Sequence, residues 1–550
     1  MRGYIVKRSL RVVLLGAAMA IALTACTAPG GSTSSGSGSS GSSETALYGG
    51  TMTTAAASDP ETFDPAVCTG ATCWNIMRMV FDRMYDYDGA TSNLKLQAAE
   101  DFPTVSDDGL TYTMKLKSGL TFSDGSPVTA KDVAYSYARV LDPATKAGLA
   151  EFWKGIAGAA DYAANPTGLP SGIVVVDDLT LKITLATPNS SFKYVLAMPA
   201  GSIIPADSGS TIATKPVGSG PFTLATFEPG VQVMLDRNPN YWDSPRPYVD
   251  HVHMILGVDP DNQVLMLQKG DIDLMGSPIP PAKFLQVTTD AKYKEQIVTI
   301  EKPSTYYLTM NMNTPPFDNP KVREAVSYAF DRDGLLKLVN GQGKPATEFI
   351  PPGVLGNSGE NLTQAQNVEK AKSLLAEAGY PNGFDTQFYA WNVAPFSALA
   401  PQMQQDLKAI GINADLQTLA PNTFAELAGS GKAPLALTFW VADYPEGSDF
   451  LQALLSCATA VPQGQNFAYY CSPEMDADVQ QALAATDPAQ ATADYTAATK
   501  IMLADNPVVP LYFGTKTEIR GANVGNYFPQ PIWGWDMAEY WKADGSTARS

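Results

Sequence analysis

The sequence predicts an α/β protein in which helices alternate with short apolar strands. Two patterns carry this prediction. Between residues 300 and 510, amphipathic helical segments alternate with apolar runs of strand length. Earlier, apolar and polar residues alternate with a period of two over 110–117 and 179–185, as in half-buried strands. At 550 residues, the chain is long enough for two or three hydrophobic cores.

The composition is that of an acidic globular protein. Apolar residues make up 45% and charged residues 17% of the chain, which is typical of globular rather than disordered sequences. The formal net charge of −18 argues against nucleic-acid binding, because that function needs a basic surface. Only two histidines occur, so catalysis or metal binding through histidine has few candidates.

Residues 1–26 have the pattern of an export signal. A basic segment up to Arg11 precedes an apolar stretch, 12–23, which is too short to span a bilayer comfortably. The following Leu-Thr-Ala-Cys is similar to the lipobox of bacterial lipoproteins, so we expect Cys26 to carry a lipid anchor. The alternative is a plain secretory signal that is cleaved nearby. The Gly/Ser-rich residues 27–45 are expected to form a flexible tether.

Several helix ends carry capping signals. Thr129 and Asp132 have the spacing of a capping box. Pro320 suits the first turn of another helix, and Gly379 suits the end of a helix over 368–378. A further helix is predicted over 74–87, with an apolar face at Ile76, Met79, Val80 and Met84.

The apolar run 435–442 predicts a buried strand that ends at a candidate binding residue. Asp443 follows it directly and stands between Trp440 and Tyr444. Ligands bind most often at strand ends in α/β domains, where a carboxylate can hold a cation and aromatic rings can cover apolar groups. We interpret this stretch as the floor of a binding cleft, and the alternative is an ordinary loop aspartate.

Four cysteines remain beyond the export signal, and an even number in an exported protein suggests disulfides. Among the three pairings that four cysteines allow, we prefer the local one, which joins Cys68 to Cys73 and Cys457 to Cys471. Zinc binding is the alternative, although the spacing is loose and no histidine lies near these cysteines in the sequence.

Motifs for catalysis or for a resident cofactor are absent from the sequence. His251 and His253 would share one face of a strand, so a metal pair is an alternative, but no cysteine or carboxylate stands beside them at ligand spacing. The sequence contains no G-x-S-x-G, H-E-x-x-H, Walker A or C-x-x-C motif. We therefore expect no enzymatic activity, no cofactor and no metal site.

Several long blocks of sequence follow one another in a characteristic order. They include VSDDGLTYTMKLKSGLTFSDGSPVTAKDVAYSYARV, KPVGSGPFTLATFEPGVQVMLDRNPNYWDSPRPYVDHVHM, YYLTMNMNTPPFDNPKVREAVSYAFDR and FWVADYPEGSDFL. Together these blocks, spread over about residues 47–540, resemble the dipeptide/oligopeptide-type solute-binding proteins of ABC importers, known as family 5.

This resemblance implies a two-lobed clamp of the periplasmic-binding-protein type, the large type II variant with an extra domain. Lobe I is then expected to combine 46–88, 206–304 and 511–550. An accessory domain of lobe I is expected over 89–205, and lobe II over 305–510. The ligand is expected to bind between the lobes, which close on it by a hinge movement.

The resemblance also implies a function. The protein would capture oligopeptides or similar small solutes and deliver them to an ABC import permease, as a monomer held by its lipid anchor on the extracytoplasmic face of the cell membrane. The alternatives are a non-peptide ligand, such as a metal chelate or an oligosaccharide, and, outside this class, a secreted hydrolase.

The family pattern also suggests which residues line the site. In peptide-binding relatives, the aspartate of an Ala-Asp-Tyr motif pairs with the α-ammonium group of the ligand, and this motif matches Ala442-Asp443-Tyr444. Trp440 matches a cleft-lining tryptophan. Where peptide binders place another tryptophan, this chain offers only Phe424. Further cleft candidates, for which core packing is the alternative, are Phe63, Tyr85, Trp533 and Trp535.

Overall fold

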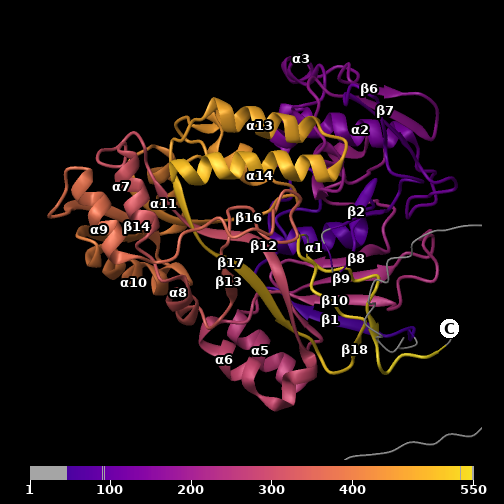
Figure 1. The fold of residues 1–550 in the computed structure, drawn as a ribbon. Helices are drawn as coiled ribbons and strands as arrows, with labels where there is room; N and C mark the ends of the chain where they lie inside the picture. The colour runs from indigo at the N-terminus through magenta and orange to yellow at the C-terminus, as the bar shows by residue number, and fades with distance from the viewer. Residues whose placement is uncertain (1–45, 90, 92, 533, 548–550) are drawn as a thin grey trace, which may run out of the picture. The chain divides into compact units, whose positions relative to one another are not determined.

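The computed structural model describes residues 46–89, 91, 93–532 and 534–547 (Figure 1). The expected export signal, the lipid anchor at Cys26, the tether and Trp533 lie outside the described residues. In the described part, the strands form sheets of five, four and six strands, and two small two-stranded sheets. The small sheets pair β2 (Tyr85–Tyr87) with β3 (Leu94–Leu96), and β18 (Val524–Gly525) with β19 (Trp541–Lys542).

The five-stranded sheet has the order β11-β1-β10-β9-β8. β1 runs parallel to β10 and β11, whereas β8, β9 and β10 are antiparallel neighbours. Apolar side chains of α1 share one buried cluster with this sheet, and those of α5 and α6 form another with Ala55 of β1. The elements are β1 (Thr51–Ala55), α1 (Ala71–Val80), β8 (Phe222–Glu228), β9 (Gln232–Arg237), β10 (His251–Ile255), α5 (Pro260–Lys269), β11 (Leu274–Met275) and α6 (Pro281–Thr289).

The helix predicted over 74–87 was placed too far along the chain, because α1 begins at Ala71 and ends at Val80. The Val80 carbonyl accepts a hydrogen bond from the Gly220 backbone N–H at 3.0 Å. The chain then turns away, and Met84 joins a different hydrophobic cluster from Ile76. A long-range backbone contact therefore ends a helix that the local apolar pattern would have continued.

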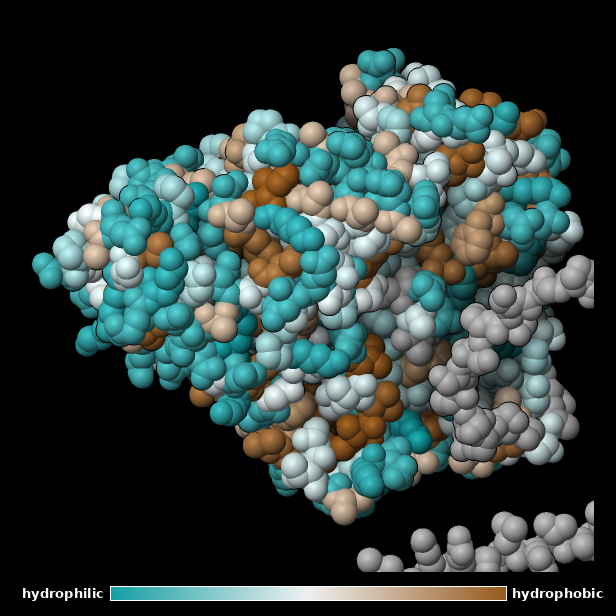
Figure 2. Space-filling model, viewed as in Figure 1, coloured by the Kyte–Doolittle hydropathy of each residue, from teal (hydrophilic) through white to brown (hydrophobic). Residues whose placement is uncertain are grey.

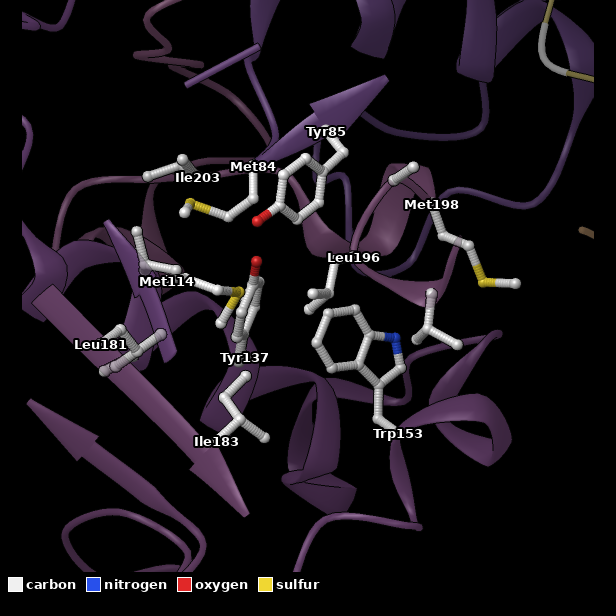
Figure 3. Packing of buried hydrophobic residues seen from close by; sticks show 14 of the residues in the cluster. Met84, Tyr85, Met114, Tyr137, Trp153, Leu181, Ile183, Leu196, Met198 and Ile203 are labelled. Atoms are coloured by element: carbon white, nitrogen blue, oxygen red, sulfur yellow. The ribbon is translucent and has the colours of Figure 1, made fainter. Parts of the chain in front are cut away.

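The four-stranded sheet has the order β4-β5-β7-β6 and packs against α2. Trp153 and Tyr137 lie at the centre of its core, with ring centroids 4.6 Å apart (Figure 3). The predicted capping box is confirmed, because the Asp132 carboxylate accepts from the Thr129 backbone N–H at 2.8 Å. The elements are β4 (Thr104–Val105), β5 (Thr111–Lys115), α2 (Ala130–Leu141), α3 (Ala159–Ala164), β6 (Ile173–Val175), β7 (Thr180–Thr184) and α4 (Phe192–Val195).

The six-stranded sheet has the order β13-β17-β12-β16-β14-β15. β14, β15 and β16 run parallel, while β12 is antiparallel to both β16 and β17. The strand predicted from the apolar run 435–442 is confirmed as β16. The strands are β12 (Ile297–Met310), β13 (Gly343–Pro345), β14 (Phe384–Trp391), β15 (Ile412–Leu419), β16 (Leu435–Val441) and β17 (Val508–Ile519).

Helices cover both faces of this sheet. Leu308 of β12 belongs to a cluster with α7–α10, and the next residue, Tyr307, belongs to a cluster with α12–α14, as expected for strand alternation. The predicted helix over 368–378 is confirmed as α9, which Gly379 follows with a φ of +93°. The helices are α7 (Pro320–Ser327), α8 (Arg332–Leu338), α9 (Val368–Glu377), α10 (Phe396–Ala409), α11 (Pro421–Gly429), α12 (Ser448–Leu455), α13 (Pro473–Ala484) and α14 (Pro488–Asp505).

Two long strands connect the five- and six-stranded sheets. The first part of β12 pairs with the end of β17 from Ile297 to Glu301, next to a bridge between Leu274 and Arg520. Their pairing is irregular between Glu301 and Thr305, after which β12 enters the six-stranded sheet. β17 continues to Ile519, because β12 supplies a hydrogen-bonding partner for the residues that follow 510.

The face of the molecule seen in Figure 2 is mainly polar. Figure 2 shows hydrophilic residues over most of the viewed face, with hydrophobic residues in small separate groups. Among the described residues, no helix combines the length and the apolar character needed to cross a membrane.

Candidate functional site

The loop that joins β16 to α12, residues 442–447, lies at one edge of the six-stranded sheet. β14, β15 and β16 run parallel and end at Trp391, Leu419 and Val441, so their carboxyl ends share that edge. In α/β sheets this is the edge at which ligands bind. The loop therefore lies at the strand ends where ligands bind in such sheets, and the binding cleft itself stays a prediction.

Two carboxylates lie close together here, Asp443 in the loop and Asp449 in the first turn of α12. Asp449, which is 0% exposed, accepts hydrogen bonds through Oδ2 from Trp440 Nε1 and from the Asp443 backbone N–H, both at 2.9 Å. Its Oδ1 is buried and has no hydrogen-bond partner. Asp449 thus fixes both the indole of Trp440 and the backbone that carries the half-buried Asp443 side chain.

The protonation of these carboxylates reflects their surroundings. Burial raises the pKa of Asp443 to about 6. Burial, followed by repulsion from the Asp443 charge, raises the pKa of Asp449 well above its usual value. Among the described residues, no lysine, arginine or histidine acts on either carboxyl group. Asp443 therefore carries a negative charge above about pH 6 that a ligand cation would complete.

Trp440 and Tyr444 flank Asp443 in the sequence but face different surroundings. Trp440 is half-buried against the cluster that contains α12–α14. Tyr444 is only 6% exposed, and its ring stacks on Tyr194 and meets Phe152 edge-on, with centroids 6.3 and 6.0 Å away. The tyrosine thus belongs to the core built around the four-stranded sheet, a position that the local sequence did not indicate.

Glu446 makes a second contact between the same loop and distant parts of the chain. It is 0% exposed, and its Oε1 accepts from the hydroxyl groups of Ser190 at 3.0 Å and Tyr495 at 2.8 Å. Burial raises its pKa. The sequence analysis did not single out Glu446, and its position in the FWVADYPEGSDFL block was the only available signal.

Aromatic rings gather beside the carboxyl ends of β14 and β16. Trp391 lies 5.4 Å from Phe439 and 5.8 Å from Phe424, measured between ring centroids. Phe424 itself is fully buried. The region where a second cleft tryptophan was sought thus contacts Trp391, which comes from another strand. Sequence reasoning missed Trp391, although its position at the end of an apolar strand could have indicated it.

The weaker cleft candidates lie in hydrophobic cores. Phe63 and Trp535 are 4% and 3% exposed and share the cluster of the five-stranded sheet and α1. Phe63 also borders a cavity of about 850 Å³ with Phe227. Tyr85 is fully buried in the core around the four-stranded sheet. Core packing accounts for these three rings.

A larger cavity of about 860 Å³ lies next to Pro445 of the loop. Its wall includes Leu94, Tyr194 and Lys193 on one side, and Leu355 with residues of the α13–α14 connection on the other. It is mainly apolar, and Asp443 is not among its lining residues.

The four described cysteines and His251 have defined partners. Disulfides join Cys68 to Cys73 and Cys457 to Cys471, the same local pairs that the sequence analysis preferred. His251 Nδ1 lies 2.7 Å from Asp236 Oδ1. Within the described residues, no group of three or more His, Cys, Asp or Glu side chains is arranged to hold a metal ion.

Comparison with known proteins relates this geometry to a family. Residues 93–461 match the family described as bacterial extracellular solute-binding proteins, family 5. The glutathione-binding protein GsiB of Escherichia coli (strain K12) is 31% identical over 498 residues, which cover 88% of this chain and 93% of GsiB.

Solved structures agree with this relationship. The clavulanic acid biosynthesis oligopeptide binding protein 2 has a TM-score of 0.84 and 25% identity, with 90% of this chain and 96% of that chain covered. The periplasmic binding protein DppA from Helicobacter pylori, in complex with the peptide STSA, has a TM-score of 0.71 and 25% identity, with 90% and 99% covered. This chain therefore has the mixed α/β fold of, and belongs to, the family 5 extracellular solute-binding proteins, which bind solutes rather than act as enzymes.

Proposed function

We propose that this protein captures peptides or peptide-like solutes outside the cytoplasm and delivers them unchanged to an ABC import permease. The observation that carries the proposal is the Asp443 carboxylate, which lies half-buried at a strand end without a cationic partner among the described residues. The α-ammonium group at the start of a peptide supplies the missing charge.

The neighbours of Asp443 suit this role. Asp449 accepts from the Asp443 backbone N–H, so the loop is positioned before the ligand arrives. An ammonium group at the Asp443 carboxylate makes charge-assisted hydrogen bonds, which are stronger than those between neutral groups, and low solvent exposure strengthens them further. We assign Trp440 to the wall of the ligand site, and Tyr444 to the closure of the loop against Tyr194.

The relatives support a peptide-like ligand. GsiB is named for glutathione, and the DppA structure contains a peptide. Both molecules carry an ammonium group and at least one carboxylate. This shared chemistry favours a peptide over an oligosaccharide or a metal chelate as the ligand of this chain.

The arrangement of the domains is also part of the proposal. We assign 46–88, 206–304 and 511–550 to lobe I, 89–205 to an accessory domain, and 305–510 to lobe II, with β12 and β17 as the hinge strands. The separate sheets and their separate hydrophobic clusters support these boundaries. Acylation of Cys26 would hold this monomer on the extracytoplasmic face of the membrane through the tether, and the Leu-Thr-Ala-Cys sequence supports it.

Calorimetric titration with trialanine tests the proposed function. We expect the wild-type protein to bind trialanine, and Asp443→Asn to weaken binding by about 10- to 100-fold, because a hydrogen bond to a charged group is lost. N-acetyl-trialanine, which lacks the ammonium group, should bind weakly to both proteins.

Asp385→Asn is the matched control, because this exposed aspartate stands near the opposite end of β14. It should bind trialanine like the wild type. Equal affinity of Asp443→Asn and the wild type for trialanine would rule out the ammonium-binding role.

A further inference from the structure

Lys302 lies on β12 directly across from the Asp443 loop. Ser304 of β12 is the partner of Val441, and the Ala442 backbone N–H donates to the Pro303 carbonyl at 2.8 Å. Continuing this antiparallel register by one residue sets Lys302 opposite Asp443. Lys302 also lies within the irregular part of β12, where pairing with β17 is interrupted and the strand passes between two sheets.

Lys302 is a half-buried cation without an anion beside it. In the described part of the chain, no carboxylate forms an ion pair with Lys302 or acts on its charge. Burial, together with repulsion from Lys516, lowers the pKa of Lys302 to about 8. Lys516 has polar partners of its own, because its Nζ lies 3.0 Å from Glu518 Oε1 and 3.3 Å from the Gln530 carbonyl oxygen.

We infer that Lys302 binds a carboxylate of the ligand, so that the site selects a solute carrying both an ammonium group and a carboxylate. This inference rests on the proposed function. The backbone register sets Lys302 and Asp443 opposite each other with charges of opposite sign, yet no ion pair joins them among the described residues. A dipolar ligand between them neutralises both. The compact ammonium of lysine serves as a point charge for a carboxylate group.

A purely structural role for Lys302 makes the opposite prediction about stability. An unpaired, poorly solvated charge destabilises the folded protein. A lysine whose methylene chain packs against apolar groups stabilises it. Lys302→Met keeps most of the apolar length of the side chain and removes its charge. We therefore expect Lys302→Met to raise the melting temperature of the ligand-free protein at pH 7, and a lower melting temperature would contradict the inference.

The binding test compares trialanine with trialanine amide, which lacks the carboxylate. We expect the wild type to prefer free trialanine by about 10-fold or more, the effect of one hydrogen bond to a charged group. Lys302→Met should bind both ligands with the affinity that the wild type has for the amide. Lys302→Arg keeps the charge and should retain most of the preference.

Lys516→Met is the matched control, since it removes a neighbouring lysine that already has partners. It should keep the wild-type preference for free trialanine. If the wild type bound trialanine and its amide equally, while N-acetylation still abolished binding, the inference would fail and the proposed function would stand. If neither trialanine nor its amide bound to the wild type, both would fail.

Discussion

Under the proposed function, Asp443 and Asp449 are single residues arranged for a cationic partner that the ligand supplies. Both carboxyl groups have raised pKa values because they are poorly solvated, and Asp449 also experiences the charge of Asp443. A neighbouring lysine or arginine would lower both pKa values, but none acts on these groups among the described residues. Under the proposed function, folding stability is thus lost where binding is gained, a known trade-off at functional sites.

The pH dependence of stability follows from the raised pKa of Asp443. Its carboxyl group holds a proton up to about pH 6 in the folded protein but only to about pH 4 in the unfolded chain. The stabilisation is therefore complete below pH 4 and is lost as the pH rises from 4 to 6. We expect Asp443→Asn to raise the free energy of unfolding by about 1–3 kcal/mol at pH 7.5 and to change it little at pH 4.

Thermal unfolding of the ligand-free proteins at the two pH values measures this difference. Asp385→Asn serves again as the exposed control. A stabilisation by Asp443→Asn that was the same at pH 4 and pH 7.5 would show that Asp443 titrates normally.

At the scale of elements, the 442–447 loop holds distant segments together. Through Glu446 it contacts Ser190, which precedes α4, and Tyr495 of α14. The Ser190 backbone N–H also donates to the Leu483 carbonyl at the end of α13, at 2.8 Å. In the proposed domain arrangement, the Ser190 contacts cross between the accessory domain and lobe II, whereas the Tyr495 contact lies inside lobe II.

This difference predicts separate effects for two conservative variants. In the proposed arrangement, Ser190→Ala removes a hydrogen bond between the accessory domain and lobe II. We therefore expect it to lower the population of a closed form and to weaken apparent trialanine affinity by about 3- to 10-fold. Tyr495→Phe removes a bond within lobe II, so it lowers the melting temperature and changes the affinity less. Titration and thermal unfolding of both variants would test this expectation, which equal losses of affinity would contradict.

Local patterns predicted the elements that local interactions control. The strand ending at Val441, the capping box at Thr129 and the end of α9 at Gly379 follow from apolar spacing and capping chemistry within a few residues. The end of α1 could not be predicted in this way, because Gly220 determines it from a distant part of the sequence. Lys302 was missed for a similar reason, since only the pairing of β12 with β16 brings it opposite Asp443.

At the scale of the whole molecule, β12 and β17 couple the sheets. Each strand takes part in the six-stranded sheet, and their other ends pair with each other beside β11 of the five-stranded sheet. The irregular pairing between Glu301 and Thr305 lies between these two regions. A hinge at this position would bend the strands next to Lys302, so ligand contact and lobe movement would be linked.

Ligand binding should therefore stabilise the whole protein without chemical change of the ligand. Trialanine at about 100 times its dissociation constant should raise the free energy of unfolding by about 2.7 kcal/mol. Scanning calorimetry measures the stabilisation, and mass spectrometry of the recovered trialanine checks that it is intact. Cleavage of the peptide would favour a hydrolase.

The buried position of Tyr444 has a consequence for the release of the ligand. Its ring is stacked on Tyr194 inside a core made largely by a much earlier part of the chain. If the lobes separate as proposed, this ring is withdrawn and the apolar surface that it covered is exposed to water, which has a free-energy cost. In the proposed function, docking on the ABC permease would have to offset this cost before the solute is released.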